Sequence, residues 1–134
     1  MSKYNNPTPV IREVDINYGT TGSSPYTDLT AMGDVLILGY SFYVVTAFTS
    51  TTNTSTLNIH TDDTTPTDLI SAADGAEASL TVKTQIFPTA ALTTPFQLRS
   101  GQKIQHTVGG EDQTAGAGKL VIEYMPISRD GRLM

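Results

Sequence analysis

Residues 35–49 read VLILGYSFYVVTAFT, and this stretch decides the fold class. Successive side chains of a β-strand point to opposite faces of a sheet, so strands show a period of two. Apolar side chains occupy both parities of the stretch, one with Leu36, Leu38, Tyr40, Phe42, Val44 and Phe48, and the other with Val35, Ile37, Tyr43 and Val45. This pattern predicts either one central strand or two strands that change sheet at residues 39–41. A glycine at residue 39 is typical of a bulge or bend.

Alternation on both sides of this stretch predicts further strands. They are expected near residues 10–18, 57–60, 79–87 (with Leu80, Val82, Thr84 and Ile86 inward), 96–99, 102–108 and 119–125 (with Leu120, Ile122 and Tyr124 inward). About eight short strands separated by turns are typical of a sandwich or barrel. Long, uneven loops favour a jelly roll. The predicted fold class is therefore all-β, a single antiparallel, jelly-roll-like β-sandwich with extended N- and C-terminal tails.

The segments between these strands are rich in Gly, Ser, Thr and Asn. Within residues 61–78, Asp68 is positioned to cap one helical turn that runs through Ala73 and ends at Gly75. Residues 109–118, GGEDQTAGAG, predict a mobile hairpin loop before the last strand. The turn at Ser100-Gly101 is expected to join the two strands that flank it.

We expect residues 1–134 to form one β-sandwich domain. Residues 1–9 are predicted to be an N-terminal arm, residues 10–126 the core, and residues 127–134 a C-terminal tail after Pro126. A chain of this length can bury a core without covalent cross-links.

The composition supports strands and excludes thiol chemistry. The chain contains 22 threonines, and β-branched residues fit a pleated sheet better than a helix. There are no cysteines, so neither disulfides nor thiolate metal sites can form. Stability must come from the core or from association with other subunits.

The charge distribution argues against nucleic acid and anionic membranes as partners. The net charge is −5, and no Lys or Arg occurs between Arg12 and Lys83. Binding to phosphates requires a cationic patch, which this half of the chain does not supply. The N-terminal residues do not resemble a signal peptide, and the apolar stretch at 35–48 is too short to span a bilayer. We therefore expect synthesis in a host cytoplasm as a soluble protein.

The two histidines are isolated from other metal ligands in the sequence. His60 shares the polar parity of its strand, which predicts a surface or edge position. His106 lies between Ile104 and Val108, which predicts an inward side chain with ring nitrogens satisfied by backbone groups. Neither pattern favours a metal centre or a general base.

Other residues that could carry chemistry are more typical of turns. Asp62, Asp63 and Asp68 share one loop, but their spacing is not that of a calcium-binding EF-hand loop, so solvated turn acids are expected. No nucleophile elbow, phosphate loop or dinucleotide motif occurs. We predict a protein that is not an enzyme and has no catalytic residues, no metal site and no cofactor.

The two predicted termini carry basic side chains outside the core. The arm contains Lys3 and Tyr4, and the tail contains Arg129 and Arg132. Termini are often disordered in isolation. A functional alternative is that they order against a partner, with the arginines pairing to its carboxylates.

The last third of the chain resembles the ending of many small virion proteins of tailed bacteriophages. The resemblance lies in Phe96-Gln-Leu-Arg-Ser-Gly-Gln-Lys-Ile-Gln-His-Thr-Val-Gly-Gly, a Gly/Ala/Thr-rich loop, and Gly118-Lys-Leu-Val-Ile-Glu-Tyr-Met-Pro126. The chain as a whole is similar to jelly-roll capsid decoration (cement) proteins in size and strand content.

This resemblance implies a structural protein at the capsid surface of the virion. Such a subunit binds the outside of an assembled head and bridges neighbouring major capsid protein subunits, as a dimer or trimer on local symmetry axes. The alternative hypothesis is a receptor- or glycan-binding virion module, such as a head fibre or a tail-associated knob.

Overall fold

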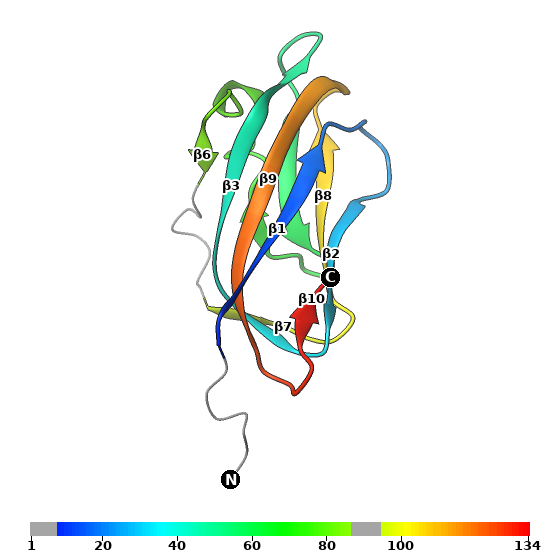
Figure 1. Ribbon diagram of the computed structural model, residues 1–134. Helices are drawn as coiled ribbons and strands as arrows, with labels where there is room; N and C mark the ends of the chain where they lie inside the picture. The colour runs from blue at the N-terminus through cyan, green and yellow to red at the C-terminus, as the bar shows by residue number, and fades with distance from the viewer. Residues whose placement is uncertain (1–7, 87–94) are drawn as a thin grey trace.

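The computed structural model describes residues 8–86 and 95–134 (Figure 1). Almost all regular structure in these residues is β-strand. The elements are β1 (Val10–Asn17), β2 (Tyr26–Met32), β3 (Val35–Ser50), β4 (Thr56–Thr61), β5 (Asp68–Ile70), the short 3-10 helix η2 (Glu77–Ser79), β6 (Gln85–Ile86), β7 (Phe96–Leu98), β8 (Lys103–Gly109), β9 (Gln113–Pro126) and β10 (Arg132–Leu133). Among the described residues, no helix combines the length and the apolar character needed to cross a bilayer.

The strands form two antiparallel sheets that pack face to face. One sheet has the order β1-β9-β3-β6, with β7 also paired to β3, and the other has the order β10-β2-β8-β4-β5. When β6 and β7 are counted as one position and β10 is set aside, the two orders β1-β9-β3-β6 and β2-β8-β4-β5 are those of an eight-strand jelly roll, in which every connection except β4–β5 passes from one sheet to the other. The predicted all-β antiparallel sandwich is confirmed.

The strand β3 resolves the two alternatives for the stretch that decides the fold. It runs unbroken through one sheet, with β9 on one side and β6 and β7 on the other. Its register against β9 shifts between Ile37 and Gly39, so Leu38 is an extra residue in a bulge. Before the bulge Val35 and Ile37 are buried, and after it the buried apolar side chains are the even-numbered Tyr40, Phe42, Val44 and Phe48. The bulge therefore explains why buried apolar side chains occur in both parities.

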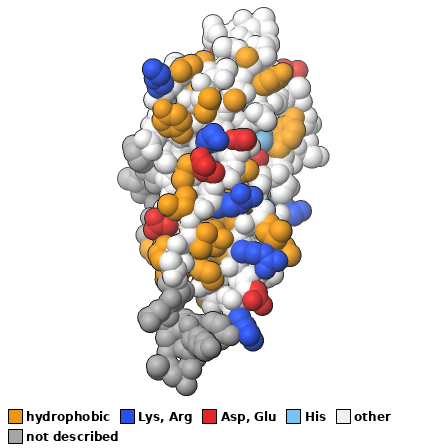
Figure 2. Space-filling view, in the orientation of Figure 1, with side chains coloured by type: hydrophobic (Ala, Val, Ile, Leu, Met, Phe, Trp, Pro, Cys, Tyr) orange, Lys and Arg blue, Asp and Glu red, His pale blue; other side chains and the backbone are white. Residues whose placement is uncertain are grey.

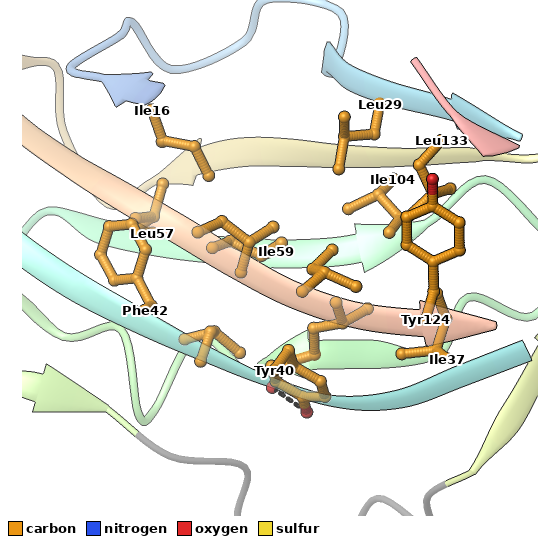
Figure 3. Close-up of a cluster of buried hydrophobic side chains, with 14 of the residues drawn as sticks. Ile16, Leu29, Ile37, Tyr40, Phe42, Leu57, Ile59, Ile104, Tyr124 and Leu133 are labelled. Carbon is orange, nitrogen blue, oxygen red and sulfur yellow. Dashed lines mark hydrogen bonds between the residues drawn. The ribbon is translucent and has the colours of Figure 1, made fainter. Parts of the chain in front are cut away.

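The core lies between the two sheets and joins all the long strands. Figure 3 shows side chains of β1, β3 and β9 facing those of β2, β4, β8 and β10. Phe42 and Phe48 are among the largest fully buried side chains, with ring centroids 6.1 Å apart. Tyr40 donates a 2.6 Å hydrogen bond to the carbonyl of Leu69, and burial raises the pKa of its phenol. The polar end of Tyr40 is thereby satisfied inside the core.

The prediction of a mobile loop at residues 109–118 is wrong. Only a short turn separates β8 from β9, and β9 begins at Gln113. A side chain at Gly116 would place its Cβ 2.3 Å from Cδ1 of Phe48, and one at Gly118 would lie 2.3 Å from Cζ of Phe42. The glycines are therefore a strip of strand over which two buried rings pack, and not a sign of loop structure.

The prediction that the strands on either side of each of these turns pair with one another as hairpins is also wrong. The strand β7 pairs with β3, while β8 pairs with β2 and β4. The turn at Ser100-Gly101 and the turn before β9 therefore each carry the chain from one sheet to the other. Local turn chemistry predicts a reversal of direction, but not the strand that becomes the partner.

Two segments between β4 and β7 also differ from the prediction. The expected helical turn at residues 68–73 begins as β5, because Ile70 pairs with Ile59 of β4. In the expected strand at 79–87, Leu80 is buried but Val82 is 53% exposed, and only β6 is a strand. The prediction there extends to residue 87, which lies outside the described residues.

Two further strands have weak sequence signals. The strand β2 was not among the predicted strands, because only two of its side chains, Leu29 and Ala31, are buried. Residues 127–134, predicted as a tail outside the core, contain β10, which pairs with β2 and buries Leu133. This tail is thus a component of the sandwich and does not lie outside the core.

Candidate binding surfaces

The outer face of the sheet that contains β1, β9 and β3 is a mixed apolar and charged surface (Figure 2). Exposed apolar side chains on it include Ile11 and Val45, at 67% and 48% exposure. Lys119 of β9 lies between two carboxylates of β1, 3.3 Å from Asp15 and 3.9 Å from Glu13. All three charged side chains are well exposed, so these ion pairs contribute little stability and leave the face available to a partner.

A hollow of about 370 Å³ lies on this face where the three strands run side by side. Its lining residues come from all three strands and are Ile11, Leu38, Gly39, Tyr40, Ser41, Val121 and Glu123. Ile11, Glu123 and Gly39 form one row across the strands. Because Gly39 has no side chain, the backbone of β3 is open at this point.

One end of the sandwich is fixed by carboxylates that accept hydrogen bonds from loop hydroxyls and amides. Glu77, which is only 7% exposed, accepts bonds from the amide and hydroxyl of Ser50 and from the hydroxyl of Ser55 at 2.6 Å. Burial opposes its ionisation, but these bonds outweigh burial and lower the pKa of Glu77. The loop between β3 and β4 is therefore held by a buried anion.

Two acids of the turn between β8 and β9, the half-buried Glu111 and the exposed Asp112, hold neighbouring loops in the same way. Glu111 accepts bonds from the amide of Thr52 at 2.6 Å and from its hydroxyl at 2.9 Å. Asp112 accepts bonds from the amide and hydroxyl of Thr21 at 2.7 and 2.8 Å. These contacts tie the connections β1–β2, β3–β4 and β8–β9 into one ordered end.

We expect this end to lose stability at acidic pH through Glu111. The neighbouring hydroxyl of Ser50 and the hydrogen bonds from Thr52 and Thr54 lower the pKa of Glu111 from 4.5 to about 2. Because folding lowers this pKa, the stabilisation is complete above pH 4.5 and is lost as the pH falls toward 2. Glu111→Gln should therefore lower the melting temperature most at neutral pH, and the difference from the wild type should shrink between pH 4.5 and 2. Thermal melts across this range test it.

The matched control is Asp130→Asn, which neutralises an exposed acid outside this end. It should leave the acid dependence of the melting temperature unchanged. If Glu111→Gln also retains the full wild-type dependence, Glu111 does not carry the effect.

The predicted inward position of His106 is confirmed, but its partner is a carboxylate and not the backbone. Its Nδ1 lies 2.7 Å from Oδ2 of Asp28, and both side chains are less than a tenth exposed. The ring of Tyr26 stacks on His106 with centroids 4.8 Å apart. Asp28 lies on β2, the strand with the weak signal, so sequence reasoning had no means of finding this pair. The pair joins β2 to β8 within one sheet.

The predicted surface position of His60 is wrong. His60 is only 8% exposed, and its ring nitrogens lie 2.9 Å from the carbonyl of Thr61 and 2.8 Å from the hydroxyl of Thr107. Thr107 of the neighbouring strand β8 therefore contacts a side chain that the alternation alone places toward solvent.

The three acids expected to be solvated in one loop accept hydrogen bonds from the chain. Asp62 accepts the amide of Lys103, Asp63 accepts the hydroxyl of Thr61 and the side-chain amide of Gln102, and Asp68 accepts the side-chain amide of Asn58. Within residues 8–86 and 95–134, no group of three or more His, Asp or Glu side chains is placed to hold a metal ion.

The structure describes the basic residues of the C-terminal tail but not those of the N-terminal arm. Lys3 and Tyr4 lie outside the described residues. The guanidinium of Arg132 donates to the carbonyl of Asp130 at 3.3 Å and lies 3.2 Å from the sulfur of Met134. The predicted pairing of Arg129 and Arg132 with a partner's carboxylates stays a prediction.

Comparison with known proteins finds likeness in structure but not in sequence families. No protein-family model matches the chain, and no curated protein matches it. A chain in the capsid asymmetric unit of cyanophage Pam1 is similar in structure, with a TM-score of 0.62 and 16% identity, over 94% of this chain and 90% of that one. A chain in the acidic stable capsid structure of Helicobacter pylori bacteriophage KHP30 has a TM-score of 0.55 and 15% identity, over 96% of this chain and 98% of that one. The shared feature is the fold.

Proposed function

We propose that this chain is a structural protein of a bacteriophage virion and acts as a capsid decoration (cement) protein. The observation that carries the proposal is the near-complete correspondence with chains of two phage capsid structures, at 90% and 98% of their lengths. The likeness covers 94% and 96% of this chain and almost the whole of those chains. A small sandwich of this kind is thus a unit that occurs as a separate chain within phage capsids.

In the proposed role, the chain binds the outside of an assembled head and bridges major capsid protein subunits. A protein that binds the assembled lattice but not its separated subunits stabilises the lattice by mass action. A dimer or trimer on a local symmetry axis would contact several coat subunits at once, and each additional contact gains from the effective concentration. The exposed apolar side chains and the hydrogen-bonded loop end provide two rigid surfaces for such contacts.

Co-sedimentation with undecorated capsids of the source phage tests this function. We expect saturable binding at a fixed ratio to the major capsid protein, because lattice sites are equivalent and limited in number. Bound chain should also raise the melting temperature of the capsid. Scanning calorimetry of capsids with and without saturating chain measures this shift.

Capsids of an unrelated phage serve as the control and should neither retain the chain nor gain thermal stability. Absence of binding to the cognate capsid at micromolar concentration would exclude the cement role. Receptor or glycan recognition would then become the leading alternative.

A further inference from the structure

Gly39 directly follows the bulge at Leu38, but neither a positive φ nor close packing requires a glycine there. It lies in the interior of β3, the longest described strand. A Cβ at this position would meet no atom within 4 Å, whereas one at Gly118 would meet Phe42. Glycine weakens a strand interior, and one remaining reason to place it there is the close approach of another chain. The opening at Gly39 is thus a candidate docking point.

The hollow above Gly39 has a defined chemistry. Ile11, Leu38 and Val121 form aliphatic walls, and Glu123 contributes an exposed carboxylate. Among residues 8–86 and 95–134, no side-chain hydrogen bond or ion pair involves the carboxylate of Glu123. A lysine side chain matches both parts, since its methylene stem packs on apolar surface while its ammonium pairs with a carboxylate.

We propose that the hollow receives the N-terminal arm of a second copy of this chain, with Lys3 paired to Glu123. Lys3 is the one cation of the sequence that precedes the described sandwich. The arm is joined to β1, whose Ile11 lines the hollow, so it leaves the sandwich close to the docking point. Seven extended residues span roughly 24 Å, whereas the distance across the three adjacent strands β1, β9 and β3 is about 10 Å. The arm is therefore long enough to cross the face of an adjacent copy.

A second copy is favoured over the arm of the same chain by the residues that precede β1. To reach its own hollow, the arm would have to reverse direction between Pro7 and Pro9. A residue before proline favours extended backbone, which opposes a reversal at Asn6 and Thr8. Two copies related by a two-fold axis can instead exchange arms, each reaching the hollow of the other. The arm exchange specifies a contact within the proposed homo-oligomer, and it does not depend on capsid binding.

Sedimentation equilibrium of the full chain and its variants tests the arm exchange. We expect the wild type to self-associate, and we expect deletion of residues 1–7, Gly39→Val, Lys3→Glu and Glu123→Lys each to weaken association by about tenfold or more. The double variant Lys3→Glu/Glu123→Lys should recover much of the loss, because the ion pair is restored with its charges exchanged. Asp130→Lys, a charge reversal of an exposed acid outside the hollow, is the matched control and should associate like the wild type.

The charge exchange keeps the test decisive even where Gly39→Val does not fold. A chain that is monomeric at all concentrations overturns the proposal, as does association that survives deletion of residues 1–7. Association that is lost in Gly39→Val but retained without the arm would assign the hollow to another segment of the second copy. A monomer that still binds capsids at a fixed ratio would refute the arm exchange and leave the proposed function standing.

Discussion

Truncation of Phe42 to alanine should lower the free energy of unfolding by about 3–5 kcal/mol. Phe42 has no exposed surface and lies in the middle of β3, where its ring packs over Gly118 of β9 and near Phe48. Its removal leaves a cavity between the sheets that the paired strands cannot close. Urea unfolding measures the loss. Tyr43→Ala is the matched control, because Tyr43 is the next residue of β3 but is 40% exposed on the outer face, and a much smaller loss is expected there.

The contact between Phe42 and Gly118 predicts a coupling that tests the same packing independently. Gly118→Ala is expected to cost about 1–3 kcal/mol, because its Cβ would lie 2.3 Å from Cζ of Phe42 and 3.0 Å from the carbonyl oxygen of Tyr43. In a Phe42→Leu background, the penalty of Gly118→Ala should shrink, since the obstructing ring is gone. A double-mutant cycle measures the interaction. Penalties that simply add would contradict the contact.

Removal of the buried carboxylate by Glu77→Ala is expected to lower the free energy of unfolding by about 2–4 kcal/mol. The carboxylate of Glu77 is the acceptor for the amide of Ser50 and for the hydroxyls of Ser50 and Ser55. Without it, three donors remain in a poorly solvated site with no acceptor, and each costs desolvation free energy. Chemical denaturation at pH 7 measures the effect.

The control for this site removes the donors together with the acceptor. Glu77→Ala combined with Ser50→Ala and Ser55→Ala should be less destabilised than Glu77→Ala alone, because two hydroxyls no longer lack a partner. If the triple variant is instead the least stable, the loss comes from packing and not from unsatisfied donors.

Local sequence patterns predicted the strands whose burial follows a simple period. Leu120, Ile122 and Tyr124 are buried as the alternation in β9 requires, whereas in β1 only Ile16 is buried, and Val10 and Tyr18 of the same alternation are exposed. The high threonine content indicated strands, the long and uneven loops indicated a jelly roll, and the strand order agrees. These features are local, because the period of a strand and the conformational preference of β-branched residues depend only on neighbours in the chain.

Interactions between distant segments decided the candidate surfaces. The partner of His106 lies on β2, 78 residues away, and the side of β3 that is buried changes at a bulge set by its register against β9. The hollow at Gly39 exists only because Ile11 and Glu123 are brought into the same row.

The glycines of β9 show why the same residue type carries opposite meanings. Residues 113–118 have the composition of a loop, yet they are a strand because Phe42 and Phe48 pack onto Gly118 and Gly116. Gly39 lies in a sequence typical of a strand, yet it opens a hollow on the surface. The sequence by itself determined the all-β class and most of the strands, because propensity and period are local. The pairing of strands across sheets decided which glycines are packed and which are open, because register is a property of two distant segments together.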